Sequence, residues 1–295
     1  MNRRRFVYCA ATGLMVPAVR ASTLIPFSFW SSGCPLSSNA AFALNDWISR
    51  VQAASSDVTI AGTRAAVGCY IDGLMTDGVW TKLVRHSIFA GNDLNALKAP
   101  LKNGGPASAD VLPNFVAGDY TQAVGLQGGS TKYVDTGLPW NSTAGSMSDT
   151  SFHASLYTRT LQTAGLATLQ FGTAGAVYTA LIIRTDANTY FYLNSAVDTI
   201  VTYSDPDGIG HYIGTRTASN AAALYKNGAS VATGLVAIGA RLTGTMFIGC
   251  LNNNGAPTAY SDAIFEQYSV GTGITAADAT NLYNRYVTLR KALRR

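Results

Sequence analysis

Leu224-Tyr225-Lys226-Asn227-Gly228 is the stretch of this chain that decides its predicted fold. Asn-Gly between two apolar runs is a strong hairpin signal, because both central positions of a type I′ turn need φ > 0 and these residues tolerate it. Downstream come Met246-Phe247-Ile248-Gly249, an aromatic stretch over residues 260–268, and Thr275-Ala276-Ala277-Asp278, which can open a terminal helix. The order of these signals predicts antiparallel strands closed by a helix.

A period of two runs through the chain from about Asn114 onwards. The expected strands are short, rich in β-branched and aromatic residues, and separated by Gly, Asn, Asp or Pro; they fall at residues 133–136, 151–160, 178–185, 189–193, 199–203, 211–217, 221–226, 230–233, 245–250 and 263–270. Strands at this spacing favour a sandwich or barrel over βαβ units. The last element, from Thr275 to about Leu293, is expected to be an amphipathic helix with Asp278 in a capping box.

This ordered set of hairpin, Ile-Gly strand, aromatic strand and closing helix resembles the laminin-G-like, concanavalin-type β-sandwich family, over roughly residues 114–290. The resemblance implies a mainly β, antiparallel jelly-roll sandwich that binds a glycan or another surface ligand. Many members carry a Trp-His pair before the hairpin, whereas Gly210-His211-Tyr212-Ile213 has Tyr and no Trp. The resemblance also implies calcium as a possible cofactor at the sandwich rim, without naming its ligands.

The chain is expected to divide into three parts. Residues 1–21 read as a signal peptide, either twin-arginine or ordinary secretory, because Arg3-Arg4-Arg5-Phe6 precedes a short apolar run and small residues end it. Residues 22–105 read as a linker and a small helical accessory region, because apolar residues recur at helical spacing near 42–51, 67–75, 79–84 and 94–101. After the Gly104-Gly105-Pro106 boundary, residues 112–295 form the sandwich with its closing helix.

The N-terminus and the charge balance together indicate an exported protein. The apolar run before residue 21 is far shorter than the roughly 20 residues that a membrane span needs. Removing residues 1–21 takes away four arginines and no acids, which leaves 17 basic and 16 acidic residues and a net charge of about +1. That balance argues against a nucleic-acid partner. We expect a periplasmic, extracellular or virion-associated protein, encoded by a bacterium or a phage.

Three cysteines remain after the expected cleavage. In an oxidising compartment, Cys34 and Cys69 are the expected disulfide pair, because both fall in the same N-terminal region. Cys250 follows an apolar strand and is expected to be a small buried residue. No two cysteines have metal-ligand spacing, so a zinc site is not expected.

Glu266 is the only glutamate in the chain and, with Asp262, forms the best catalytic candidate that the sequence offers. Glycoside hydrolases generally need two carboxylates that face one glycosidic bond. An unbroken strand over residues 260–268 would point both side chains to one face. Further acids are missing, so a solvated or hydrogen-bonded pair without catalytic function is the preferred interpretation. We therefore expect no enzyme activity, and a glycoside hydrolase is the weakest of the alternatives.

Three aromatic residues are the candidate ligand contacts. Tyr190 and Tyr192 should share one strand face, with Phe191 on the opposite face in the core. The tyrosine face is either a stacking platform for a sugar or a surface packed against the helical region, and packing is the preferred alternative. Trp140 lies in an expected loop, where it either stacks on a sugar or plugs the end of the sandwich.

The remaining polar signals have structural interpretations. His86, His153 and His211 are far apart in the sequence, and the last two sit in expected strands as packed side chains. Asp205-Pro206-Asp207-Gly208 is read as a turn, because it lacks the spacing of a calcium loop. The preferred function is non-catalytic, lectin-like recognition of a glycan or surface ligand. The alternative is a structural or adhesive component, such as a phage tail or surface-layer protein, that associates with its own copies.

Overall fold

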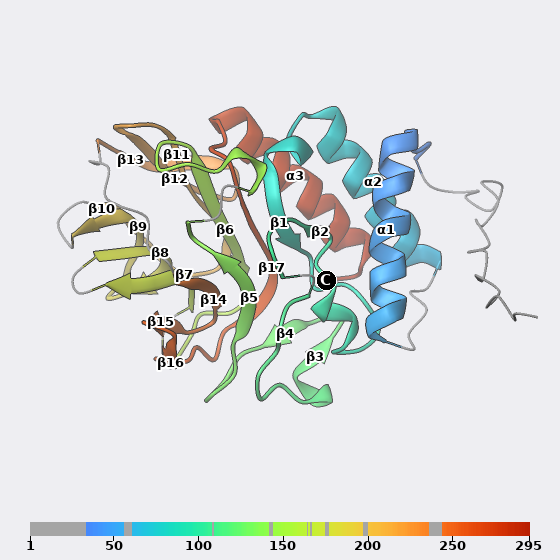
Figure 1. The fold of residues 1–295 in the computed structure, drawn as a ribbon, viewed down its shortest axis with the longest axis horizontal. Coiled ribbons are helices and arrows are strands. Elements are labelled where there is room, and N and C mark those ends of the chain that lie inside the picture. Colours follow the sequence, from blue (N-terminus) through green and yellow to red (C-terminus); the bar gives the residue numbers. More distant parts are fainter. Residues whose placement is uncertain are drawn as a thin grey trace, which may run out of the picture. The chain divides into compact units, whose positions relative to one another are not determined.

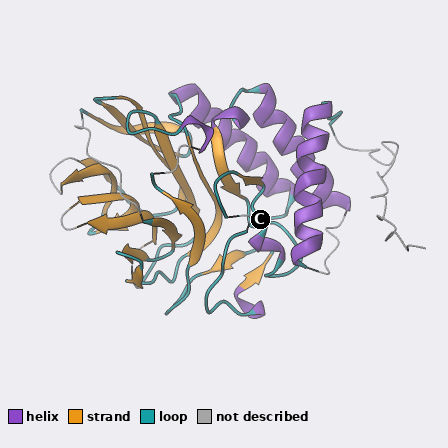
Figure 2. Ribbon diagram, in the orientation of Figure 1, coloured by secondary structure: helices purple, strands orange, loops and turns teal. Residues whose placement is uncertain are grey.

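The computed structural model describes residues 34–55, 61–107, 109–141, 144–163, 165, 167–174, 177–196, 200–235 and 244–295. Within this part, the chain is mainly β, with two large antiparallel sheets and three α-helices (Figure 1). The helices are α1 (Ser38–Ala54), α2 (Ala61–Thr76) and α3 (Ala276–Ala292). Figure 2 shows the helices gathered on one side of the strands. The expected signal peptide lies outside the described residues.

The larger sheet has nine strands, and its main path runs β13-β12-β11-β6-β17-β1-β2. Strand β4 pairs with β17, and β3 pairs with β4. The strands are β1 (Leu83–Ser87), β2 (Lys102–Asn103), β3 (Tyr120–Thr121), β4 (Gly125–Gln127), β6 (Phe152–Thr158), β11 (Gly210–Ala218), β12 (Ala221–Lys226), β13 (Ala229–Gly234) and β17 (Ile264–Gly271).

The second sheet has six strands in the order β10-β9-β8-β7-β14-β5. They are β5 (Val134–Pro139), β7 (Ala167–Ala174), β8 (Val177–Thr185), β9 (Asn188–Ala196), β10 (Ile200–Ser204) and β14 (Thr245–Ile248). A separate hairpin joins β15 (Leu251–Asn253) to β16 (Ala256–Thr258), and short 3₁₀ turns lie at η2 (Trp80–Lys82), η3 (Ala96–Lys98), η4 (Ala117–Asp119) and η5 (Ala144–Ser146).

The hydrophobic core lies between the two sheets, as alternation along the strands predicts. Leu156 and Tyr268 contribute from the nine-stranded sheet, and Leu181 and Phe191 contribute from the six-stranded sheet. All four side chains are fully buried. The mainly β sandwich expected from the sequence is thereby confirmed, whereas the jelly-roll connectivity stays a prediction.

Helices α2 and α3 cover the other face of the nine-stranded sheet, and α1 packs against α2 (Figure 1). Tyr286 of α3 lies 5.4 Å, centroid to centroid, from Tyr157 of β6, and Tyr70 of α2 lies 5.7 Å from His86 of β1. The expected capping of α3 is present, because Thr275 accepts a hydrogen bond from the backbone of Asp278 and the Asp278 carboxylate accepts one in return.

The Asn-Gly hairpin is confirmed. A two-residue loop, Asn227-Gly228, joins β12 to β13, and both residues have positive φ, at 52° and 79°. The carbonyl of Gly228 also accepts a hydrogen bond from Thr280 of α3 at 2.9 Å. The turn therefore sets the strand register and also touches the closing helix.

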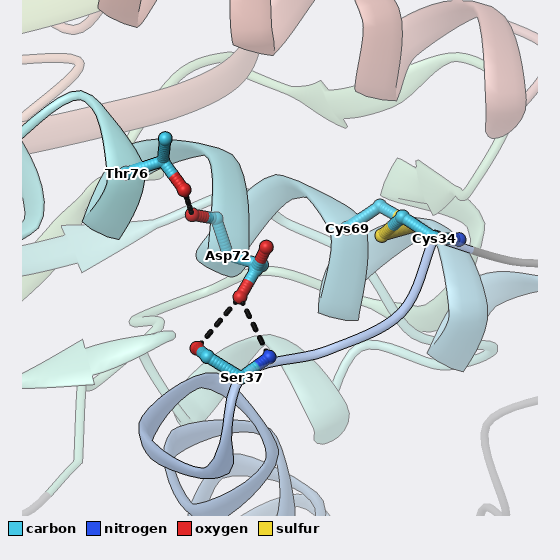
Figure 3. Close-up of a disulfide and its surroundings, with 5 residues drawn as sticks. All are labelled: Cys34, Ser37, Cys69, Asp72 and Thr76. Atoms are coloured by element: carbon cyan, nitrogen blue, oxygen red, sulfur yellow. Dashed lines mark hydrogen bonds between the residues drawn. A yellow bond between two sulfur atoms is a disulfide. The ribbon is translucent and has the colours of Figure 1, made fainter.

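A disulfide joins Cys34 to Cys69 of α2, the pair chosen from the sequence (Figure 3). Next to it, the Asp72 carboxylate accepts hydrogen bonds from the backbone and the hydroxyl of Ser37, at 2.9 and 2.7 Å. Ser37 in turn caps the first turn of α1. The start of α1 is thus tied to the middle of α2.

Residues 79–101 differ from the expected helices. Residues 80–82 form a 3₁₀ turn, and Leu83–Ser87 continues as β1, which pairs with β17 on one side and β2 on the other. All five residues of β1 are buried, so the strand shows no alternation of polar and apolar residues. Gly104 donates to the carbonyl of Val84 at 2.8 Å, and residues 33–295 form one compact unit. The stretch expected to end an accessory region is therefore part of the main sheet.

Candidate functional site

Tyr190 and Tyr192 lie side by side on the outer face of the six-stranded sheet. Their ring centroids are 5.9 Å apart with the planes inclined at 39°, and both side chains are partly exposed. Phe191 between them is fully buried in the core, as predicted. The alternation of β9 therefore presents two neighbouring rings on one surface and anchors the strand with the third.

Two rows of cross-strand partners form this surface, which we call the tyrosine face. Tyr190 pairs with Ile182 of β8 and Thr202 of β10, and the adjacent row consists of Ala180, Tyr192 and Ile200. Ile182 and Ala180 are almost fully buried, so the tyrosine rings, Thr202 and Ile200 form the accessible part of these rows. The face is neutral and offers aromatic surface with hydroxyl groups at its edges.

None of the described helices packs against the tyrosine face, because all three lie on the far side of the nine-stranded sheet (Figure 1). The preferred sequence interpretation, that Tyr190 and Tyr192 pack against the helical region, is therefore wrong. That interpretation failed because a chain of short strands does not reveal which of its two sheets the helices cover.

Trp140 lies in the sandwich interior. Its side chain is fully buried and meets Phe152 edge-to-face, with ring centroids 4.3 Å apart. Trp140 therefore fills the sandwich and is not placed to stack on a sugar. The buried ring leaves no face open for a sugar.

Asp262 and Glu266 are not brought together. Strand β17 begins at Ile264, after Asp262, and a bulge interrupts its pairing between Phe265 and Gln267. Asp262 accepts hydrogen bonds from the backbone and the hydroxyl of Thr163, in a loop. The premise that one unbroken strand points both carboxylates to one face therefore does not hold.

Glu266 is fully buried beneath the C-terminal end of α3. Arg290 donates to both of its carboxylate oxygens, at 2.5 and 3.1 Å, and Arg159 lies 3.5 Å away. The guanidinium of Arg290 also lies 4.5 Å from the ring centre of Tyr157. This buried carboxylate is paired with two arginines, and the pair with Arg290 links α3 to the sheet.

The turn at residues 205–208 is neutralised from within the chain. Lys226 places its ammonium 2.7 Å from Asp205 and 2.5 Å from Asp207. Burial alone would raise the pKa of Asp205, but hydrogen bonds from Lys226, Thr189 and Tyr212 hold that pKa below its usual value. A lysine between the two carboxylates fits the turn interpretation and does not fit a calcium loop at this place.

The three histidines lie on the same, helix-covered face of the nine-stranded sheet, which sequence reasoning missed. They come from β1, β6 and β11, and burial lowers the pKa of His86 and of His153 to about 4 and the pKa of His211 to about 3. His153 contacts the carbonyl of Thr272 at 2.6 Å, whereas neither ring nitrogen of His211 has a hydrogen-bond partner among the described residues. These groups are neutral and covered, so we regard them as part of the packing.

An open pocket of about 560 Å³ lies where the nine-stranded sheet extends past the start of α3. Cross-strand pairing places Thr215, Ala223 and Thr233 in one row of its floor, and Thr275 and Ala276 form a wall. No charged residue lines it among those described. No local sequence pattern indicates this pocket, because its lining comes from three strands and the start of a helix.

Neither a cluster of metal-ligating side chains nor a membrane-spanning helix is found among the described residues. No group of three or more His, Cys, Asp or Glu residues there is placed to hold a metal ion. None of the described helices is long and apolar enough to cross a membrane.

No protein-family model matches the sequence, and a search of curated proteins finds no match. Solved structures with similar folds include domain 4 of AbnA, a GH43 extracellular arabinanase from Geobacillus stearothermophilus, in complex with arabinotriose. That alignment has 15% identity and a TM-score of 0.44, and it covers 68% of this chain and 98% of the domain.

Two further structures have related folds. A Trypanosoma rangeli sialidase mutant aligns with 14% identity and a TM-score of 0.47 over 70% of this chain and 33% of the sialidase. The CBM40 of Ruminococcus gnavus IT-sialidase, bound to α2,6 sialyllactose, aligns with 12% identity and a TM-score of 0.38 over 54% of this chain and 95% of that module. The similarities are too low to transfer a ligand, and the laminin-G-like assignment stays a prediction.

Proposed function

We propose that this protein binds a glycan on the tyrosine face without cleaving it. The observation that carries the proposal is the pair of partly exposed rings at Tyr190 and Tyr192, 5.9 Å apart on a sheet face that no described helix covers. The C–H-rich face of a pyranose packs on an aromatic ring, and two adjacent rings can hold two positions on an oligosaccharide. Because β9 is braced by the buried Phe191, the rings need little ordering when a ligand binds.

The proposal of binding without catalysis is supported by the state of the two candidate acids. Hydrolysis of a glycosidic bond generally needs two carboxylates that approach the bond from opposite sides. Glu266 is buried against Arg290, and Asp262 is in a separate loop contact with Thr163. Neither carboxylate belongs to the tyrosine face.

Export of the protein remains part of the proposal. The disulfide between Cys34 and Cys69 supports it, because disulfides persist in oxidising compartments and are rare in the cytosol. Fusing residues 1–25 to a reporter tests it directly. We expect the reporter to leave the cytoplasm, and the double substitution R3K/R4K to block its exit if the twin-arginine route is used. A native fusion that stays inside the cell would disprove export.

The binding proposal is tested by a glycan array followed by titration of the full-length protein with and without EDTA. We expect Tyr190→Ala and Tyr192→Ala each to weaken the best ligand about tenfold or more, which is roughly 1.4 kcal/mol. Phe42→Ala is the matched control, because Phe42 is a 77% exposed ring on α1, on the opposite side of the molecule. Equal loss in all three variants, or no loss in the tyrosine variants, contradicts the proposal.

Self-association is the second candidate function, and the edge of the nine-stranded sheet favours it. Strand β13 ends the described order of that sheet and reads Ala-Ser-Val-Ala-Thr-Gly, with no charge to discourage pairing with another copy. Light scattering across a range of protein concentrations tests it. We expect a Ser230→Lys variant to lower the apparent mass if copies pair along β13.

A further inference from the structure

We infer that the glycan bound on the tyrosine face is uncharged, and that the face discriminates against sialylated, uronate-bearing and sulfated chains. This inference rests on the proposed function and names the class of ligand for the same site. It is carried by the charge content of four neighbouring strands and by the contacts of the one cation among them.

The strands that build the face contain almost no charge. Residues 167–204, from the start of β7 to the end of β10, contain one cation, Arg184, and two acids, Asp186 and Asp198. The net charge of this segment is therefore −1. The rest of the chain carries the other 20 of its 21 basic residues, so basic side chains are scarce in this part of the sheet.

Arg184 is already engaged at the turn over residues 205–208. Its guanidinium Nε donates to the backbone carbonyl of Asp205 at 3.0 Å, and its backbone nitrogen donates to Thr189 at 3.0 Å. A methyl group built on Gly208 would lie 3.0 Å from the Arg184 Cβ and Cδ, so the side chain packs along the 205–208 turn. Moving it toward a ligand would break this contact.

Both cross-strand rows of the face are neutral where they are accessible. The first row is Thr202, Tyr190 and Ile182, and the second is Ile200, Tyr192 and Ala180. The first acid along the second row is Asp135, which pairs with Phe247 at the far end of the sheet. An anionic ligand would meet tyrosine rings, with no basic side chain among the described residues of the two rows to replace the water that it gives up.

Desolvation decides between the two ligand classes. A carboxylate or sulfate that loses hydration without a paired cation is strongly disfavoured, whereas a neutral pyranose loses only hydroxyl hydration and can regain hydrogen bonds from Thr202 and the tyrosines. Selectivity is a difference between two affinities, and here it comes from the missing partner for the anion. We expect the neutral ligand of a matched pair to bind at least tenfold more tightly.

The test uses matched pairs of oligosaccharides titrated into the full-length protein. The pairs are β-1,4-glucan, β-1,3-glucan and β-1,4-galactan oligosaccharides, each beside its C6-oxidised uronate form, and lactose beside sialyllactose. We expect binding of at least one neutral member, loss of that binding in Tyr190→Ala and Tyr192→Ala, and retention in the Tyr→Phe variants at both positions.

A charge introduced beside the rings gives an independent readout. Thr202 is exposed and is the direct cross-strand partner of Tyr190, so Thr202→Lys supplies the cation that the face lacks. We expect this variant to shift the ratio of the two affinities about tenfold toward the uronate member of the best pair. Thr202→Gln is the matched control of similar length without charge, and we expect it to leave the preference for the neutral member unchanged.

The outcomes separate the inference from the function on which it rests. If binding depends on the tyrosines but the acidic member of a pair binds as tightly as the neutral one, the inference is wrong and the proposed function stands. Binding of no member, or binding that the tyrosine variants leave intact, overturns the proposed function and the inference together. The inference and the proposed function are both supported if the neutral member binds more tightly, if this binding needs both tyrosine rings, and if Thr202→Lys reduces the difference in affinity.

Discussion

Glu266 shows how a single residue that resembles a catalytic acid can serve the fold instead. Its carboxylate is fully buried and receives hydrogen bonds from Arg290 and Tyr286 of α3, the latter at 3.3 Å. The only glutamate in the chain therefore links the closing helix to the sheet. A buried ion pair contributes little net stability, yet removing one partner leaves the other charge uncompensated.

We therefore predict that Glu266→Gln lowers the free energy of unfolding by about 2–4 kcal/mol, because Arg290 and Arg159 lose their carboxylate. If both carboxylates faced solvent, their amide variants would leave stability unchanged. Asp262→Asn is the matched control, since Asp262 bonds to an exposed loop at Thr163, and we expect it to cost less than about 1 kcal/mol. Urea unfolding of both variants measures the difference, and equal stability of Glu266→Gln and wild type would contradict this role.

Among the elements, the two Asn-Gly hairpins allow backbone strain to be separated from packing. Asn227-Gly228 and Asn254-Gly255 have the same residues and similar positive φ, at 52° and 79° against 54° and 91°. A Cβ built on Gly228 would lie 3.1 Å from the Thr280 Cα, whereas a Cβ on Gly255 meets nothing within 4 Å.

We predict that Gly255→Val costs about 1–3 kcal/mol from backbone strain and that Gly228→Val costs more, because it also crowds α3. Melting temperatures of the two variants, measured together, give the packing contribution as their difference. If the two variants have the same melting temperature, a side chain at Gly228 does not clash with α3. If neither variant shifts, the hairpin assignment itself is in error.

The link between α1 and α2 gives a second prediction for the elements. The disulfide closes a segment of 35 residues that contains α1. In the chain-entropy account, removing a crosslink of this length costs about 3–4 kcal/mol. We predict that Cys34→Ser/Cys69→Ser lowers the melting temperature and that a reducing agent lowers it for wild type but not for this double variant. A melting temperature that is insensitive to reduction in wild type would mean that the bond does not stabilise the fold.

The sequence predicted elements well where the local signal and the fold agree. Alternation and Asn-Gly chemistry located β8 to β13 closely, and the capping pair of Thr275 and Asp278 located α3. The same reasoning failed at β1, because a strand buried on both faces has no alternation, and Arg85-His86-Ser87 does not look apolar. Arg85 is buried because it pairs with Asp110 at 2.7 Å, a contact that the sequence does not show.

The candidate site was predicted only in part, for a related reason. Alternation placed Tyr190 and Tyr192 on one face, but their exposure depends on which sheet the helices cover. Trp140 looked like a loop residue because Gly137 and Pro139 precede it, yet β5 extends to Pro139 and Trp140 packs into the core. His86, His153 and His211 share one sheet face because of the strand order, which local patterns do not encode.

At the scale of the whole molecule, the nine-stranded sheet has an apolar face toward the sandwich and a polar face toward the helices. Cross-strand pairing places Gln267, Tyr157 and His211 in one row of the polar face, and His86, Ser269 and Ser155 lie in the next. The rings of Tyr157 and Tyr283 are inclined to the His211 ring by 29° and 26°, and each ring centroid lies 6.3 Å from that of His211. This polar layer is covered by α2 and α3, so its protonation state is coupled to the packing of the helices.

We predict that the protein loses stability as the pH falls below about 6.5, because its buried histidines resist protonation. Their pKa values in the fold are about 4 for His86, about 4 for His153 and about 3 for His211, against an ordinary pKa of 6.5. Below pH 6.5 the unfolded chain therefore binds more protons than the native one, so stability is fully present above that pH and declines as the pH falls toward 4. Each group contributes up to about 1.4 kcal/mol per pH unit in this window.

His211→Phe tests this coupling most sharply, because it keeps an aromatic ring and removes two ring nitrogens that have no hydrogen-bond partner among the described residues. At pH 7 we expect the variant to be at least as stable as wild type, since a buried unpaired polar group is replaced by carbon. At pH 5 its advantage should grow by about 1–2 kcal/mol, because one titrating group is gone.

His153→Phe, which loses its hydrogen bonds to Thr272 and Ser269, should instead be less stable at pH 7. Urea unfolding at pH 7, 6 and 5 measures these slopes, and a His211→Phe slope equal to that of wild type would show that this histidine is not held neutral by the covering helices.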